Sequence, residues 1–196
     1  MVTVCEKDMC AGCMACIDIC PKDAITIRDS LHAYNAVIDT DKCVECTACH
    51  KVCQVGQKPD CHEPRLWIQG WADNEDIRKR SSSGGIATAL MAAFIEEGGT
   101  VCSCTFAHGV FGFDFAESYD DLRRFVGSKY VKSNPSGIYK KIKTRLKNGE
   151  KILFIGLPCQ VAAVKKYVGD KLAKCLYTVD LICHGYAFSE VDLICF

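Results

Sequence analysis

The sequence predicts an α+β protein in which a small cysteine-rich domain is followed by an α/β domain. Two observations predict this division. A cysteine pattern occurs twice within residues 1–57, and strand-like and helix-like segments alternate from Leu66 onward. Such alternation is typical of α/β regions with parallel strand pairs. Because a breaker-rich stretch at 56–60 separates the two parts, we place the first domain at 1–60 and the α/β region after it.

Eight of the 16 cysteines form two runs with the spacing C-x-x-C-x-x-C-x-x-x-C, and the second run lies 33 positions after the first (10 to 43). This spacing is typical of thiolate ligands to 4Fe-4S clusters, for which three ligands come from one run and the fourth from the other. The repeat therefore predicts a bacterial-type dicluster ferredoxin domain with two 4Fe-4S clusters. The expected ligands are Cys10, Cys13, Cys16 and Cys53 for cluster one, and Cys43, Cys46, Cys49 and Cys20 for cluster two.

The surroundings of the two runs agree with this interpretation. Short strands are expected at 2–4, 24–28 and 36–38, and small residues separate the cysteines so that backbone N–H groups can approach sulfur. Pro21 follows Cys20 as the motif expects, but Gln54 replaces the equivalent proline after Cys53. Paired zinc sites are the alternative, since C-x-x-C units also bind zinc; the double occurrence of the full spacing favours the clusters.

Composition restricts the class of protein. With 24 Lys and Arg against 24 Asp and Glu in 196 residues, the formal net charge is zero, so no overall field favours nucleic acid or a membrane surface. No run of 18 apolar residues and no signal-peptide layout is found, which predicts no membrane span. We therefore expect a cytoplasmic protein in a reducing compartment.

The α/β region is predicted element by element from its hydrophobic pattern. Strands are expected at 66–71, 100–106, 111–116, 152–155 and 176–182. Helices are expected from Ile86 to Gly98, at 119–125, at 138–147 and from Pro158 to about Val168. The helix after Gly85 is expected to bury one face that contains Ile86, Leu90, Met91, Phe94 and Ile95.

Cysteines outside the two runs differ in their expected roles. Pro158 can start a helix, which places Cys159 in its first turn, and Cys183 follows a strand. If the strands before them are parallel, both cysteines lie on the rim of the sheet where α/β folds bind ligands; two buried core cysteines are the alternative. Packing or simple exposure is expected for the remaining four considered, Cys5, Cys61, Cys102 and Cys104.

Four motifs carry a resemblance to a known family: RSSSGGI at 80–86, GSKYV at 127–131, GLPCQV at 156–161 and VDLICHG at 179–185. Together they resemble the coenzyme F-420 hydrogenase/dehydrogenase beta-subunit family, in the version with an N-terminal dicluster ferredoxin domain. The resemblance implies FAD on the α/β part, exchanging electrons with the clusters and a hydride with a deazaflavin or another acceptor. The cofactor-binding residues that it implies are Ser82, Ser83, Gly84, Gly85, Lys129 and Tyr130.

The resemblance also implies that Cys159 and Cys183 are ligands of a further cluster, together with a later C-x-x-C pair that this sequence lacks. The resemblance therefore implies the N-terminal part of the family's region at 61–149 and the start of its C-terminal domain, truncated, at 150–196. The expected function is that of an iron-sulfur electron-transfer oxidoreductase subunit with a redox partner protein. The alternative is a non-catalytic electron carrier, docking module or truncated remnant that binds clusters only.

Overall fold

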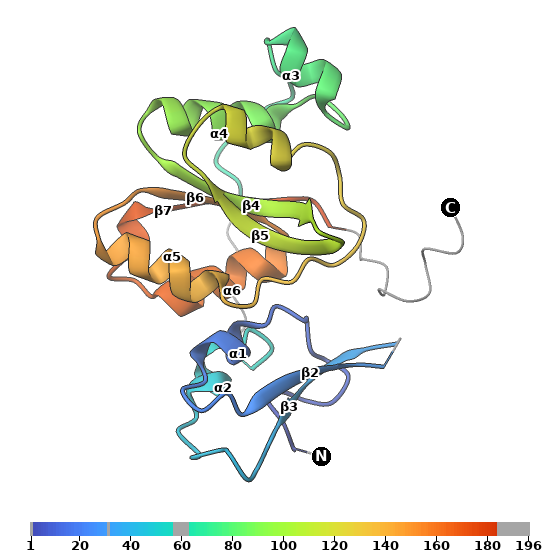
Figure 1. Ribbon diagram of the computed structural model, residues 1–196, viewed down its shortest axis with the longest axis vertical. Coiled ribbons are helices and arrows are strands. Elements are labelled where there is room, and N and C mark those ends of the chain that lie inside the picture. The colour runs from blue at the N-terminus through green and yellow to red at the C-terminus, as the bar shows by residue number, and fades with distance from the viewer. Residues whose placement is uncertain (1, 31, 57–62, 184–196) are drawn as a thin grey trace.

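The computed structural model describes residues 2–30, 32–56 and 63–183. The fold is α+β, as predicted: a small N-terminal domain lies against a larger domain built on a four-stranded sheet (Figure 1). In the part of the chain just given, no helix combines the length and apolar character needed to cross a membrane.

The N-terminal domain is a three-stranded antiparallel sheet with two short helices. The sheet has the order β1-β3-β2, so the strand that leads into the second cysteine loop occupies its centre. Its elements are β1 (Val2–Thr3), α1 (Ala15–Ile19), β2 (Ile25–Asp29), β3 (Tyr34–Ile38) and α2 (Ala48–Val52). All three expected strands are present, with end points that differ by one or two residues.

The internal repeat extends to the backbone conformation. Helix α1 and helix α2 are each five residues long and start 33 positions apart, as the cysteines do. Gly12 and Met14 in the first loop have positive φ, and so do Glu45 and Thr47 at the equivalent places in the second. Non-glycine residues rarely adopt this conformation, so its recurrence shows that both loops are bent by the same requirement, to turn their cysteines inward.

The larger domain has a sheet of order β5-β4-β6-β7, in which β4 pairs with β5 in antiparallel and with β6 in parallel orientation. Strands β6 and β7 are also parallel, which confirms the expectation of parallel pairs. The strands are β4 (Thr100–Ala107), β5 (Val110–Ala116), β6 (Ile152–Gly156) and β7 (Leu176–Asp180). The helices are α3 (Glu75–Arg80), α4 (Ile86–Glu96), α5 (Ile138–Lys147) and α6 (Pro158–Val168), with 3-10 helices at η1 (Asp120–Arg124) and η2 (Ala173–Cys175).

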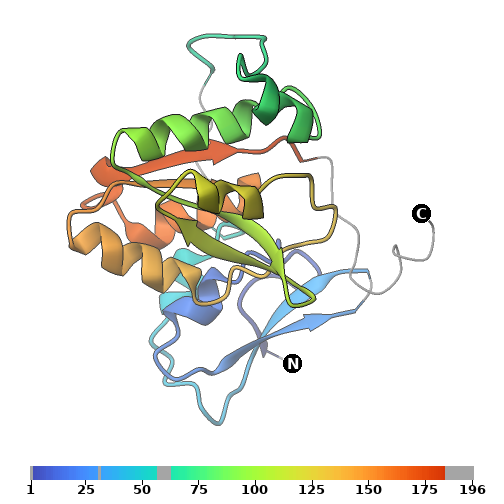
Figure 2. The same ribbon diagram turned by 45° about the horizontal axis from the view of Figure 1, so that its top comes forward.

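Both faces of the sheet are covered (Figures 1 and 2). Ile152 and Phe154 of β6 pack toward α5 and α6, whereas the alternate residues Leu153 and Ile155 pack toward α4 and η1. This strict alternation places a fully apolar strand between two helical layers. The α5 and α6 layer continues into the core of the N-terminal domain, so the two domains share one hydrophobic cluster.

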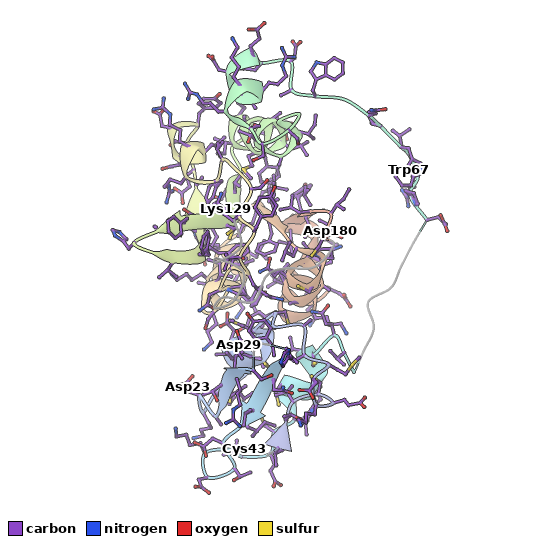
Figure 3. The ribbon with its side chains drawn as sticks, turned by 90° about the vertical axis from the view of Figure 1, so that its right-hand side faces the viewer. Asp23, Asp29, Cys43, Trp67, Lys129 and Asp180 are labelled. Carbon is purple, nitrogen blue, oxygen red and sulfur yellow. The ribbon has the colours of Figure 1, made fainter. Side chains whose placement is uncertain are left out.

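Two expectations about the larger domain are wrong in detail. Residues 66–71 form no strand: they are extended without a partner, and Trp67 is 86% exposed, on a segment that stands off from the body (Figure 3). Strand-favouring side chains do not suffice where no neighbouring strand supplies hydrogen bonds. On α4, Ile86 and Leu90 are each 45% exposed, because the helix buries a face centred on Met91 and Ala92.

The structure also contains helix α3, which is not among the helices expected from the sequence. Its N-cap is Asn74, whose side-chain oxygen accepts hydrogen bonds from the backbone N–H groups of Asp76 and Ile77. An asparagine followed by acidic residues is a helix-start signal, and acidic side chains in the first turn favour the helix dipole. The start signal is present in the sequence, but a helix of six residues is too short to show a hydrophobic repeat.

Candidate metal centres and cofactor site

The eight cysteines of the repeat surround two separate cavities. The first spans about 330 Å³, with the solvent at its mouth included, and is lined by Cys10, Cys13, Cys16 and Cys53; the second spans about 340 Å³ on the same basis and is lined by Cys20, Cys43, Cys46 and Cys49. Each cavity therefore receives three cysteines from one loop and the fourth from the other. Among the described residues, no three His, Cys, Asp or Glu side chains converge closely enough to hold a single ion.

The surroundings of each cavity fit a 4Fe-4S group. In the first loop the N–H of Gly12 donates to the Sγ of Cys10 at 3.4 Å, and in the second the N–H of Glu45 donates to the Sγ of Cys43 at the same distance. Such bonds stabilise negative charge on sulfur and help to set a reduction potential. Burial raises the pKa of the Cys13 and Cys16 thiols, so their thiolate forms need a positive partner such as iron.

A ninth cysteine lies at the first cavity. Cys5 lines its wall, and its pKa is raised to about 12 by burial and by the nearby Cys10 and Cys53, which also hydrogen bond to it. Because Cys5 lacks ligand spacing, the sequence predicted only packing or exposure for it. What places it here is the backbone bond from the N–H of Val4 to the oxygen of Ala36, which holds the start of the chain against β3.

The first cavity faces the larger domain, and Gln54 joins the two. Its side-chain amide donates to the backbone oxygen of Cys159 at 2.8 Å, across 105 positions of sequence. The same amide hydrogen bonds to the Cys13 thiol and lowers the pKa of that thiol, against the larger effect of burial. The glutamine that stands in place of the expected proline thus contacts both a first-cavity cysteine and the first turn of α6.

Lys132 and Tyr139 complete this junction. The Lys132 ammonium donates to the backbone oxygen of Ala11 and lies 3.7 Å from the Sγ of Cys159. The Tyr139 hydroxyl donates to the backbone oxygen of Cys13 at 2.8 Å, and Tyr139 is completely buried. The first cysteine loop is therefore held by three side chains, of which two come from the larger domain.

Asp18 anchors the opposite end of the same contact. This residue of α1 is 3% exposed, and its carboxylate accepts hydrogen bonds from the N–H groups of Gly137 at 2.6 Å and Tyr139 at 3.1 Å. An acidic group of the small domain thereby caps the N-terminus of α5 in the larger domain. Burial raises the pKa of the Asp18 carboxyl, and the backbone bonds offset part of that effect.

Cys159 and Cys183 lie at the same rim of the sheet. Cys159 is in the first turn of α6 directly after β6, and Cys183 follows β7, which is parallel to β6. Burial raises the pKa of the Cys159 thiol and outweighs the opposing charge of Lys132; the negative charge of Cys183 raises it further, which places the two within electrostatic reach. Cys102 is fully buried in β4, as expected for a packing residue, and Cys61 lies outside the described residues.

The loop of residues 81–85 meets the loop of residues 127–130. The N–H of Ser128 donates to the hydroxyl of Ser82 at 2.9 Å, while Ser83 is exposed beside it. Gly84 is needed for close packing, because a Cβ there would lie 3.3 Å from the Cα of Trp71. Gly85 has a φ of 77° and starts α4. Ser82 is therefore bonded to the 127–130 loop just before the N-cap residue of α4.

Lys129 and Tyr130 are placed differently from each other. The Lys129 ammonium donates to the backbone oxygens of Phe125, Val126 and Gly127 at 2.8 to 3.2 Å, and burial lowers its pKa. In this position it holds its own loop. Tyr130 is 81% exposed and points away from the core, where a flat ligand could contact it.

Three family models match the chain. A 4Fe-4S dicluster domain matches residues 9–57, and the N-terminal and C-terminal parts of the coenzyme F420 hydrogenase/dehydrogenase beta subunit match residues 67–138 and 149–191. The chain belongs to this beta-subunit family. The resemblance inferred from the four motifs is confirmed, as is the dicluster ferredoxin domain that precedes it.

Individual relatives agree with this assignment. The chain is 23% identical over 207 residues to one of the subunits of the F(420)H(2) dehydrogenase of Methanosarcina mazei, covering 92% of this chain and 54% of that protein. It is 50% identical over 28 residues to a ferredoxin of Methanothermococcus thermolithotrophicus, covering 14% of this chain and 47% of the ferredoxin. The chain thus spans about half the length of the curated relatives it matches.

A solved structure is also similar, that of the xenon-derivatised F420-reducing [NiFe] hydrogenase complex of Methanosarcina barkeri. The sequence identity is 30%, with 58% of this chain and 42% of that chain covered, and the TM-score is 0.47. In the present beta-subunit chain, the two matched halves of the family contribute to one sheet: β4 and β5 belong to the first match and β6 and β7 to the second.

Proposed function

We propose that the chain is an iron-sulfur electron-transfer subunit of an oxidoreductase, which relays single electrons through two 4Fe-4S clusters to or from a flavin-type site. The observation that carries the proposal is the arrangement of the two cavities. Each is lined by four cysteines of the repeat, and the first is bonded to the rim of the larger domain through Gln54 and Lys132. An electron on the first cluster would thus lie beside the α/β domain.

The residues have distinct tasks in this function. Cys10, Cys13, Cys16 and Cys53 would hold cluster one, and Cys20, Cys43, Cys46 and Cys49 cluster two. When bound, such clusters supply one-electron steps, and a flavin supplies the change between one-electron and two-electron steps. Ala15 and Ala36 form part of the apolar wall of the first cavity, and Tyr139 keeps the first loop against the larger domain.

We further propose FAD at the two loops formed by 81–85 and 127–130. Ser82, Ser83, Gly84 and Gly85 would face the cofactor, with Tyr130 at its edge and Lys129 holding the loop. Cys159 and Cys183 are proposed as ligands of a further metal site at the rim. A redox partner protein or subunit, a deazaflavin or other small acceptor, and a reducing, cytoplasmic location complete the proposal.

Anaerobic reconstitution with iron and sulfide tests the cluster part. We expect about eight irons per chain, and a loss of about four in either Cys10→Ser or Cys46→Ser, because each removes a ligand of a different cluster. Cys175→Ser is the matched control, since Cys175 lies far along the chain in η2, and it should lose none. Cysteine variants that keep all iron, or a chain that takes up zinc in place of iron–sulfide, would reject the assignment.

The flavin part is tested separately by titrating FAD into the reconstituted chain and following the quenching of flavin fluorescence. Binding that is weakened at least tenfold by Ser83→Trp supports the two-loop site, because the exposed position would be filled by the indole ring. Absence of binding, or binding that ignores this substitution, would reject the flavin site. The alternative function, an electron carrier or docking module that binds clusters only, would then be preferred.

A further inference from the structure

The two cysteine loops have the same backbone but opposite charge environments. Gly12 and Glu45 occupy equivalent positions, with φ of 59° and 53°, and the N–H of each donates to the sulfur of the cysteine two residues earlier. Beyond this shared geometry they differ. Gly12 has no side chain, and Glu45 carries an exposed carboxylate in the second loop, between the cavity-lining residues Val44 and Cys46. A comparison of the loops therefore isolates the effect of what surrounds each.

The space above Gly12 is occupied by the side chain of Lys132. A Cβ on Gly12 would lie 3.2 Å from the Cε and 3.3 Å from the Nζ of Lys132. The ammonium is held in place by the oxygen of Ala11, by the Sγ of Cys159 at 3.7 Å and by the ring of Tyr34, whose centroid is 5.7 Å away. Lys132 is half-buried, so its charge is less screened than that of an exposed lysine.

The second cavity has no cation held in this way among the residues that the structure describes. Lys22 lines it, but this side chain is exposed and its charge is screened by water. In the second loop, the residue equivalent to Gly12 is Glu45, whose charge is opposite in sign to that of Lys132. The first loop thus has a half-buried lysine of the larger domain against Gly12, and the second loop has an exposed glutamate at the residue equivalent to Gly12.

On the basis of the proposed cluster assignment, we propose that Lys132 and Glu45 set the order of the two reduction potentials, making cluster one the higher. A cluster gains one negative charge when it is reduced, so a nearby cation stabilises the reduced form and a nearby anion destabilises it. One electron supplied by a protein donor would leave cluster two and enter cluster one, without a bond formed or broken. The electron would then rest on the side that faces Cys159.

Lys132 is a positioning residue in this proposal, and its readout is a potential. The reconstituted full chain is titrated electrochemically, with both reduced clusters followed by electron paramagnetic resonance. In Lys132→Gln the higher midpoint potential should become more negative by about 59 mV. For one electron, this shift corresponds to about a tenfold change in the equilibrium constant of reduction. The lower midpoint potential should not change. In Lys132→Arg, which keeps the positive charge, the higher midpoint potential should stay close to that of the unmodified chain.

Lys79→Gln is the matched control, because it removes the same charge from α3, at the far end of the molecule from the N-terminal domain (Figure 1). It should move neither midpoint. A shift of the lower midpoint in Lys132→Gln, an equal shift of both, or no shift would overturn the proposal. An iron content of the unmodified chain well below eight would instead reject the proposed function.

A second variant keeps the test decisive if Lys132→Gln loses cluster one, which a fall to about half the iron would reveal. Glu45→Gln leaves the domain junction untouched and removes only the exposed charge at the second loop. It should raise the lower midpoint, by less than the effect at Lys132 because Glu45 is screened. A rise of the higher midpoint, or no change, would overturn the proposal.

Discussion

Replacement of Asp18 by alanine tests the carboxylate that joins α1 to the start of α5. The substitution leaves two buried N–H groups, those of Gly137 and Tyr139, without an acceptor. Hydrogen bonds to a charged group contribute about 1.5–3 kcal/mol each, or about 3–6 kcal/mol together. Relief of the buried charge, visible as the raised pKa of Asp18, offsets part of this sum. We expect the free energy of unfolding to fall by about 2–4 kcal/mol.

The assay is anaerobic urea unfolding of the reconstituted chain, followed by far-ultraviolet circular dichroism. Asp18→Asn keeps one oxygen acceptor and should lose about half as much. Asp73→Ala, at an exposed position, is the control and should lose less than about 0.5 kcal/mol. Equal losses in Asp18→Ala and Asp73→Ala would refute the capping argument.

The pH dependence gives a second check on the same residue. The pKa of Asp18 is higher in the folded state than in the unfolded state. The stability that its protonation gives the folded chain is therefore fully present below the unfolded-state pKa and is lost as pH rises through the folded-state pKa. The difference in free energy of unfolding between the unmodified chain and Asp18→Ala should therefore narrow from mildly acidic to neutral pH. A difference that widens over this range would show that the N–H groups, and not burial, dominate the titration.

Three further outcomes follow from the structure. Gly12→Ala should lower the free energy of unfolding by about 2–4 kcal/mol, because φ is positive and a Cβ would lie 3.1 Å from the Tyr34 ring. Gly149→Ala, where φ is also positive but the space is open, should lower it by about 1–2 kcal/mol. Equal losses in urea unfolding would contradict this difference. The only two tryptophans, Trp67 and Trp71, should emit as solvent-exposed indoles and be quenched freely by acrylamide, and a protected, blue-shifted emission would be inconsistent with their exposure. Cys102 should resist alkylation until the chain is unfolded, as mass spectrometry would show, and labelling in the native chain would contradict its burial.

Local pattern predicted most of the elements, because their hydrophobic periodicity matches their burial. Helix α5 has the predicted bounds, and Ile152 and Phe154 are fully buried in a strand that the apolar run indicated. The failures are of another kind. Residues 66–71 have strand-forming side chains, but a strand needs a partner, and no local signal says whether one is within reach.

The same division applies to the candidate site. Cysteine spacing predicted both loops, because the ligands of a cluster loop are close in sequence and their geometry is local. The junction with the larger domain could not be predicted in this way. Gln54 reaches Cys159 across 105 positions and Lys132 reaches Ala11 across 121, so these contacts exist only after the domains have docked. Gln54 was visible as a departure from the motif, but its partner was not.

The shared sheet has a consequence for how this family can evolve. The junction between its two matched halves runs along the hydrogen bonds of β4 and β6, where Thr100 to Ser103 pair with Ile152 to Ile155. Exchange of one half between relatives by recombination would replace one side of this ladder and one face of the core at once. Only donors with a matching strand and matching helix face would yield a folded hybrid, so the two halves are expected to be inherited as a single unit.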